Sequence, residues 1–383
     1  MVRGWRPWAA AAIILAVLGN TMTQADDKQR PGGAAASSPA PAMINPDARA
    51  IGKATSHVSY VPVKYVAPDA NRPLRALRFA ATDAKSAHAW QESSRTLLLG
   101  LLNLADLVQQ DQAPNAGIAF NVQILKTTSE DKFTRYDLVL NSTPGRRILA
   151  ALTVPEGKGP FPAVVCIHGH SADRRALYDR NYPYPYGPHD IYAYGAELAA
   201  RGYVTIGVDV AQHVVCEKGR TLIGERLWDL MRCVTYLTTR PEVDAKRIGC
   251  AGISLGGEMA MWLGAMDTRV VATVASGALT TVEHMRADSC ACWNFPGLQE
   301  SFDFADIYCL IAPRPLQCQN GMKETPDGFP VSLAQKAFAE IEPCYKALGA
   351  ANNVQFVAHG GGHVFDLASG VAFLDSHLKT QGK

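Results

Sequence analysis

The chain has no long apolar run and almost no net charge. The run from Trp8 to Leu18 is far shorter than the roughly 20 residues that a membrane-spanning helix needs. No later segment is long or apolar enough to span a membrane. Charged residues make up 19% of the 383 residues, and the formal net charge is +2. We therefore predict no membrane span and no nucleic-acid partner, because a nucleic-acid surface needs clustered basic residues.

The nine cysteines follow no familiar metal-binding spacing. Cys290-Ala291-Cys292 lacks the two-residue spacer of common zinc knuckles, so we predict no metal site. Cys166, Cys250 and Cys318 fall in predicted buried strands, where cysteine usually packs as a small hydrophobe. The odd count leaves at least one thiol unpaired, and the spacing does not reveal any disulfide pairing.

The first residues are typical of a secretory signal peptide. Arg3 and Arg6 precede the apolar run, and Thr23-Gln24-Ala25 offers small residues around a cleavage point. The sequence thus predicts a signal peptide over residues 1–25 and export to the periplasm or beyond. An uncleaved membrane anchor is the alternative, which the short apolar run disfavours.

Composition and periodicity divide the rest of the chain into three parts. Residues 26–50 are rich in Pro, Ala, Gly and Ser and predict a disordered linker. Residues 51–117 predict a helical extension that packs on the main domain, because Leu97, Leu101, Leu104 and Val108 recur at helical spacing. Residues 118–383 are predicted to form the catalytic domain.

This last part changes from alternating to continuously apolar strands. The segment from Ile148 to Val154 alternates, whereas Ala163 to Ile167 is apolar throughout, as expected for a strand buried on both faces. Similar apolar runs recur further along, and helical segments separate most of them. We predict an α/β fold, with a mostly parallel twisted sheet covered by helices on both faces and antiparallel strands at its beginning.

Gly252-Ile253-Ser254-Leu255-Gly256 is the most informative motif of the chain. It follows the apolar run that starts at Arg247 and precedes a helix-compatible stretch that starts at Glu258. Strand, tight turn and helix in this order form a nucleophile elbow, which exposes the hydroxyl of a strained serine at the edge of the sheet. The sequence predicts Ser254 as a nucleophile; the alternative is a Gly/Ser turn in an ordinary βα unit.

A serine nucleophile needs a histidine base and an acid that orients it, in the chain order Ser, acid, His on this kind of sheet. His363 follows three glycines after a predicted strand and is the expected base, with His359 of the same loop as its rival. The acid should follow the strand Pro315 to Gln319, which we expect to run next to the elbow strand. Glu324 is favoured slightly, and Asp327 is the alternative.

The oxyanion of an acyl-transfer reaction needs two backbone N–H donors. Leu255, directly after the serine, is expected to supply one of them. His170, in the His168-Gly169-His170 loop after the predicted strand that ends at Ile167, is the candidate for the other. The ring of His168 is expected to bond within the turn and to have no direct chemical role.

Together these motifs resemble α/β-hydrolases of the dienelactone hydrolase and acetylxylan esterase type. The elbow, the His168-Gly169-His170 loop, Ile311 to Pro315 and Gly361-Gly362-His363 carry the resemblance, which extends from Asn121 to Leu378. It implies the α/β-hydrolase fold and hydrolysis of carboxylic esters through an acyl-enzyme, without metal or cofactor. Dienelactone hydrolases proper use cysteine as the nucleophile, and this chain departs from them at Ser254.

The substrate is expected to be a small-molecule or carbohydrate ester. Trp293 lies in an aromatic insertion that could stack on a sugar, or that could simply pack the loop onto the domain. Arg174 makes an anionic substrate conceivable, although exposed arginines are usually only solvated. Two other functions remain open: a prolyl oligopeptidase-type serine peptidase, and a catalytically silent hydrolase fold used for binding. The sequence does not indicate an oligomeric state.

Overall fold

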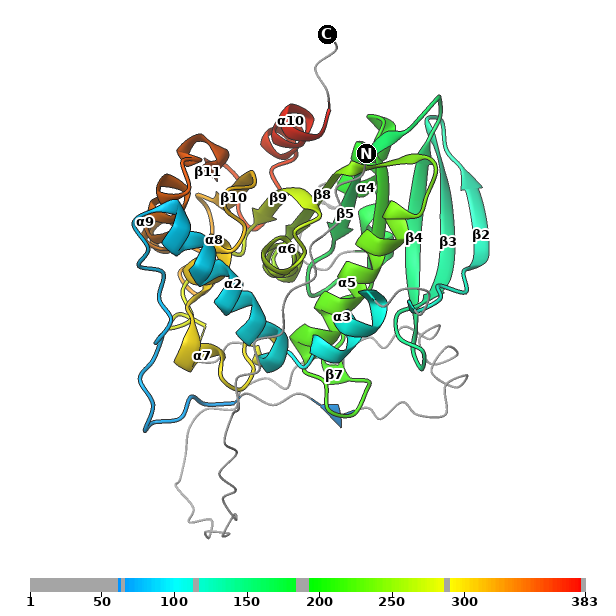
Figure 1. The fold of residues 1–383 in the computed structure, drawn as a ribbon. Coiled ribbons are helices and arrows are strands. Elements are labelled where there is room, and N and C mark those ends of the chain that lie inside the picture. Colours follow the sequence, from blue (N-terminus) through cyan, green and yellow to red (C-terminus); the bar gives the residue numbers. More distant parts are fainter. Residues whose placement is uncertain (1–60, 63–65, 113–116, 184–192, 286–289, 380–383) are drawn as a thin grey trace, which may run out of the picture. The chain divides into compact units, whose positions relative to one another are not determined.

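The computed structural model describes residues 61–62, 66–112, 117–183, 193–285 and 290–379 (Figure 1). The predicted signal peptide and linker lie outside these residues. All nine cysteines are within them, and none forms a disulfide. Of the helices that the structure describes, none combines the length and the apolar character that crossing a membrane requires.

The core of the domain is a mixed sheet with the strand order β11-β10-β9-β8-β5-β6-β4-β3-β2. Neighbours from β11 to β6 are parallel, and β6, β4, β3 and β2 pair antiparallel. This confirms the predicted fold class. The strands span β2 Gln123–Ser129, β3 Phe133–Asn141, β4 Arg147–Pro155, β5 Phe161–Ile167, β6 Val204–Val208, β8 Val243–Ile253, β9 Val270–Ser276, β10 Leu316–Gly321 and β11 Val354–His359. A separate short pair joins β1 Val61–Pro62 to β7 Val214–Val215.

Helices cover both faces of this sheet (Figure 1). Because successive strand residues point to opposite faces, Val165 of β5 packs in one core with Trp262, whereas Val164 packs in the other with Leu198. The first core holds residues of α2 Ala84–Leu101, α3 Ala105–Gln112, α5 Leu222–Thr238, α6 Leu255–Met266, α7 Leu298–Ser301, α8 Phe304–Cys309 and α9 Val331–Ala347. The second holds residues of α4 Tyr194–Ala200 and α10 Leu367–Leu378. Both faces of the central strands are therefore buried, as their continuous apolar character predicts.

The N-terminal extension forms a helical pair that packs on the domain. Leu104 of the predicted stripe is fully buried, but within α2 the buried leucine is Leu98, while Leu97 is 37% exposed. A polar side chain also anchors the buried face of α2. Gln91 is buried on the same face of α2 and donates hydrogen bonds to the carbonyls of Cys309 and Ala312, both at 2.8 Å. An apolar pattern does not reveal a face that is anchored in this way.

The strand order corrects one expectation about the acid. β10, which precedes the acid loop, pairs with β9 and β11, so β9 separates it from the elbow strand β8. The carboxyl ends of parallel strands lie at one edge of a sheet, and loops from nonadjacent strands can still meet there.

Candidate active site

The elbow at Ser254 has the backbone strain that the motif predicts. Ser254 lies between β8 and α6 with φ 60° and ψ −124°, an unusual conformation for a residue with a side chain. Gly252 and Gly256 allow this turn. A Cβ on Gly252 would lie 2.0 Å from the carbonyl oxygen of Gly256, and one on Gly256 would lie 1.8 Å from that of Ile167. The N–H of Ser254 donates to the carbonyl of Ser276 at 2.9 Å, which fixes the turn against β9.

The structure brings His363 and Glu324 together. Nδ1 of His363 lies 2.7 Å from Oε1 of Glu324, and the Glu324 side chain is only 4% exposed. The imidazole also lies close to the elbow, because a Cβ on Gly277 would be 3.0 Å from both Cε1 of His363 and Cδ1 of Ile253. With Nδ1 donating to a carboxylate, Nε2 carries the lone pair that a general base needs.

The two alternative residues lie elsewhere. Asp327 is exposed on the surface of the acid loop, whereas Glu324 is buried under it. His359 uses Nδ1 to accept the N–H of Gly361 at 3.2 Å, and burial lowers its pKa. The contacts thus favour Glu324 and His363 as the acid and the base.

The loop after β5 lies against the serine. A Cβ on Gly169 would be 3.5 Å from Cβ of Ser254. His168 braces this loop, with Nδ1 2.8 Å from the carbonyl of Gly169 and Nε2 accepting the N–H of Val210 at 3.1 Å. Burial lowers the pKa of His168, so the ring is neutral and has the structural role expected of it. The backbone of His170 follows directly, and Leu255 begins α6 on the other side of the serine.

Trp293 packs against a neighbour of the histidine. It is 4% exposed, and its ring packs 5.6 Å from that of Phe304 and 5.5 Å from that of Phe329. Phe329 in turn stacks on the imidazole of His363 at 5.5 Å with an interplanar angle of 14°. Trp293 thus packs its loop onto the domain, as one of the two predictions had it. Phe329 is a site residue that the sequence did not single out, because only the fold places it beside the base.

Arg174 does not offer an unpaired charge to a substrate. It is 4% exposed, its Nη1 donates to Oδ2 of Asp209 at 2.9 Å, and its N–H donates to Oδ1 at 2.8 Å. Arg174 is therefore buried rather than exposed, and a partly buried ion pair with Asp209 compensates its charge; its contact with a substrate stays a prediction.

Comparison with known proteins agrees with this geometry. Residues 118–279, which include the elbow, match the acetyl xylan esterase family model. YtaP of Bacillus subtilis, described as a hydrolase, is 27% identical over 229 residues, which are 54% of this chain and 74% of YtaP.

Two solved structures share the fold. A Bacteroides fragilis protein described as an acetyl xylan esterase superposes with a TM-score of 0.58 at 17% identity, over 76% of this chain and 79% of that one. A glucuronoyl esterase from Solibacter usitatus gives a TM-score of 0.56 at 16% identity, over 81% and 98%. The chain is therefore an α/β-hydrolase that resembles acetyl xylan esterases, and it is a carboxylic ester hydrolase.

Proposed function

We propose that this protein is an exported serine esterase that hydrolyses a carbohydrate ester through an acyl-enzyme. The observation that carries the serine mechanism is the strained Ser254 near His363, whose Nδ1 is paired with the buried carboxylate of Glu324. This arrangement supplies a nucleophile, a base and an orienting acid in the chain order of this fold.

In the first half of the reaction, Oγ of Ser254 attacks the acyl carbon while Nε2 of His363 takes the hydroxyl proton. The charge that develops on the carbonyl oxygen is stabilised by the N–H groups of Leu255 and His170, and the positive end of α6 adds to this. Glu324 stabilises the imidazolium. The proton then passes to the leaving alcohol as the C–O bond breaks.

In the second half, a water molecule replaces the alcohol. His363 takes one proton from the water, the hydroxide adds to the acyl carbon, and collapse of the second oxyanion returns the proton to Ser254. Acid and free enzyme are the products.

An acetylated polysaccharide of the xylan type is the substrate we propose. The family match over residues 118–279 supports an acetyl ester. The structural likeness to a glucuronoyl esterase makes esters of a sugar acid the comparison to test. Hydrolysis rates on acetylated xylan, a methyl ester of glucuronate and short nitrophenyl esters would rank these three substrate classes. A preference for the nitrophenyl esters over both sugar esters would contradict the carbohydrate assignment.

Replacing the nucleophile is the direct test of mechanism. Ser254→Ala should lower kcat on nitrophenyl acetate by roughly 10⁵-fold or more, because the group that forms the ester bond is gone. Ser93→Ala, at an exposed position on α2, is the control and should leave the rate unchanged. A fluorophosphonate probe should label the wild type at Ser254. Absence of labelling would favour the catalytically silent fold.

Export is tested on the N-terminus of the protein. The chain should be recovered outside the cytoplasm with residues 1–25 removed, so that it begins at Asp26. Exported protein that still begins at Met1 would contradict cleavage.

A further inference from the structure

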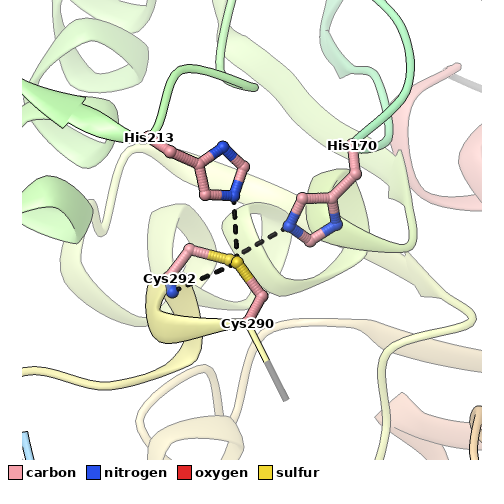
Figure 2. Close-up of side chains that lie close together, drawn as sticks. All are labelled: His170, His213, Cys290 and Cys292. Carbon is pink, nitrogen blue, oxygen red and sulfur yellow. Dashed lines mark hydrogen bonds between the residues drawn. The ribbon is translucent and has the colours of Figure 1, made fainter. Parts of the chain in front are cut away.

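Two histidines and two cysteines from three separate segments meet beside the candidate active site (Figure 2). His170 follows β5, His213 precedes β7, and Cys290 and Cys292 flank the start of the short helix Ala291–Trp293. Their four donor atoms all lie within 4.8 Å of one another. Nε2 of His170 is 3.0 Å from Sγ of Cys292, and Nε2 of His213 is 2.9 Å from Sγ of Cys290.

We propose that these four residues bind one zinc ion as a closed Cys₂His₂ site. Nitrogen and sulfur donors select zinc over hard cations such as Mg²⁺ or Ca²⁺, which prefer oxygen. A tetrahedral zinc ion with bonds of about 2.0–2.3 Å holds its ligand atoms about 3.3–3.8 Å apart. The two N···S separations of 3.0 and 2.9 Å are slightly shorter than this, and all four atoms lie within 4.8 Å of one another, so small side-chain shifts suffice.

Neighbouring backbone groups orient the nitrogen and sulfur atoms of the cluster for binding a metal. Nδ1 of His213 lies 2.9 Å from the carbonyl of Ala211, which places the proton on Nδ1 and the lone pair on Nε2, facing the sulfur atoms. The N–H of Cys292 points to Sγ of Cys290 at 3.5 Å, a contact that stabilises a thiolate. The two imidazoles stack with ring centroids 5.4 Å apart, so both present the same edge to the cysteines.

Charge also favours the ion. Two thiolates and Zn²⁺ sum to zero, so the site can be buried without a net charge. Cys292 is fully buried, and the other three residues are half-buried. The alternative, a set of thiol–imidazole hydrogen bonds, relies on S–H donors that are weak.

The one-residue spacer of Cys290-Ala291-Cys292 differs from that of a zinc knuckle, which is a local motif. In the site proposed here the histidines come from loops 77 or more positions away from the cysteines in sequence. With four protein ligands the site has no open position, which indicates a structural role. The ion would tie the loop that carries the backbone of His170 to the insertion around Trp293; an effect on the oxyanion donor rests on the serine mechanism proposed above.

The test is metal content, which does not depend on activity. The full chain, purified without a chelator or a polyhistidine tag, should contain about one zinc per molecule by elemental analysis. Replacement by Co²⁺ should give intense d–d bands of a tetrahedral ion and a thiolate charge-transfer band. Chelation should lower the midpoint of thermal unfolding.

Variants assign the ligands. Cys290→Ser, Cys292→Ser and His213→Ala should each lose the zinc, whereas Cys216→Ser, a half-buried thiol outside the cluster, should retain it. Ser254→Ala should also retain it, so that failure of the zinc site and failure of the serine mechanism are distinguishable. The proposal is overturned if folded wild-type protein takes up neither Zn²⁺ nor Co²⁺, if peptide mapping finds a Cys290–Cys292 disulfide, or if both cysteine variants keep the metal.

Discussion

The orientation of the His363 imidazole depends on the carboxylate of Glu324. It is 4% exposed and accepts from Nδ1 at 2.7 Å, so replacing it changes which imidazole nitrogen carries the proton. In Glu324→Gln the amide can donate to Nδ1, which leaves the proton on Nε2, where it blocks the base. We expect kcat on nitrophenyl acetate to fall by about 10³–10⁴-fold with little change in KM.

Asp327→Asn is the matched control, since this carboxylate is exposed on the same loop. Its activity should stay within about twofold of the wild type, as for most surface substitutions. If Asp327→Asn loses the activity and Glu324→Gln keeps it, the acid has been assigned to the wrong residue.

The buried carboxyl group of Glu258 is expected to make the free energy of unfolding depend on pH. It is fully buried in the first turn of α6, and burial raises its pKa from 4.5 to about 8, against the opposing charge of Arg226. Between these two pKa values the folded chain holds a proton that the unfolded chain has released. The free energy of unfolding therefore falls as pH rises from 4.5 to about 8 and is constant with respect to this group above that range.

Glu258→Gln keeps the shape of the side chain and removes this titration. Urea unfolding at several pH values should show that the variant gains stability relative to the wild type as pH rises through that window. Glu92→Gln, on the exposed face of α2, should follow the wild-type slope. A Glu258→Gln curve parallel to the wild type throughout would show that Glu258 does not titrate with a raised pKa.

At the scale of elements, Asp306 joins the segment before α2 to the helix α8. Its carboxylate accepts from Nε and Nη2 of Arg75 at 2.6 and 3.0 Å and from the N–H of Phe79 at 2.9 Å. It also accepts the N–H of Asp303 at 2.8 Å in the capping box of α8. Asp306 is 1% exposed, and Arg75 also pairs with Glu340, whose Oε2 lies 2.7 Å from Nη1, so neutralising Asp306 removes the buried one of these two charged partners.

Asp306→Asn should lower the free energy of unfolding by about 2–3 kcal/mol, because a buried charge-assisted network is worth more than a surface pair. The control is Asp106→Asn. Asp106 pairs with Arg220 at 2.6 and 2.7 Å but is 67% exposed, and its loss should cost about 1 kcal/mol or less. Equal losses in urea unfolding would contradict a role for burial.

The elements also show what the sequence could predict. The strand β5 and the elbow were predictable because continuous apolar runs and the glycines around Ser254 leave few alternatives. The polar anchor Gln91 was not, because its partners are backbone carbonyls more than 200 positions away. Nor was the meeting of His170 with Cys292, since no local spacing encodes a contact between separate loops.

At the scale of the whole molecule, the helical pair before β2 completes the core. Leu98, Leu102, Leu104 and Leu107 of this region are 0–5% exposed and belong to the core. Burying each leucine is worth about 2 kcal/mol, and a whole domain is stable by only about 5–15 kcal/mol. The catalytic part is therefore not expected to be stable without this pair.

Two truncations test this. A chain that begins at residue 51 lacks only the predicted signal peptide and linker and should unfold at the same urea concentration as the mature protein. A chain that begins at residue 117 also lacks α2 and α3 and should be insoluble or expose apolar surface that binds a hydrophobic dye. It would also lose the hydrogen bonds that Gln91 donates to the carbonyls of Cys309 and Ala312, and the carbonyl of Cys309 would then accept from the weaker thiol donor of Cys344. A soluble, cooperatively unfolding chain from residue 117 would instead make the helical pair an accessory of an independent domain.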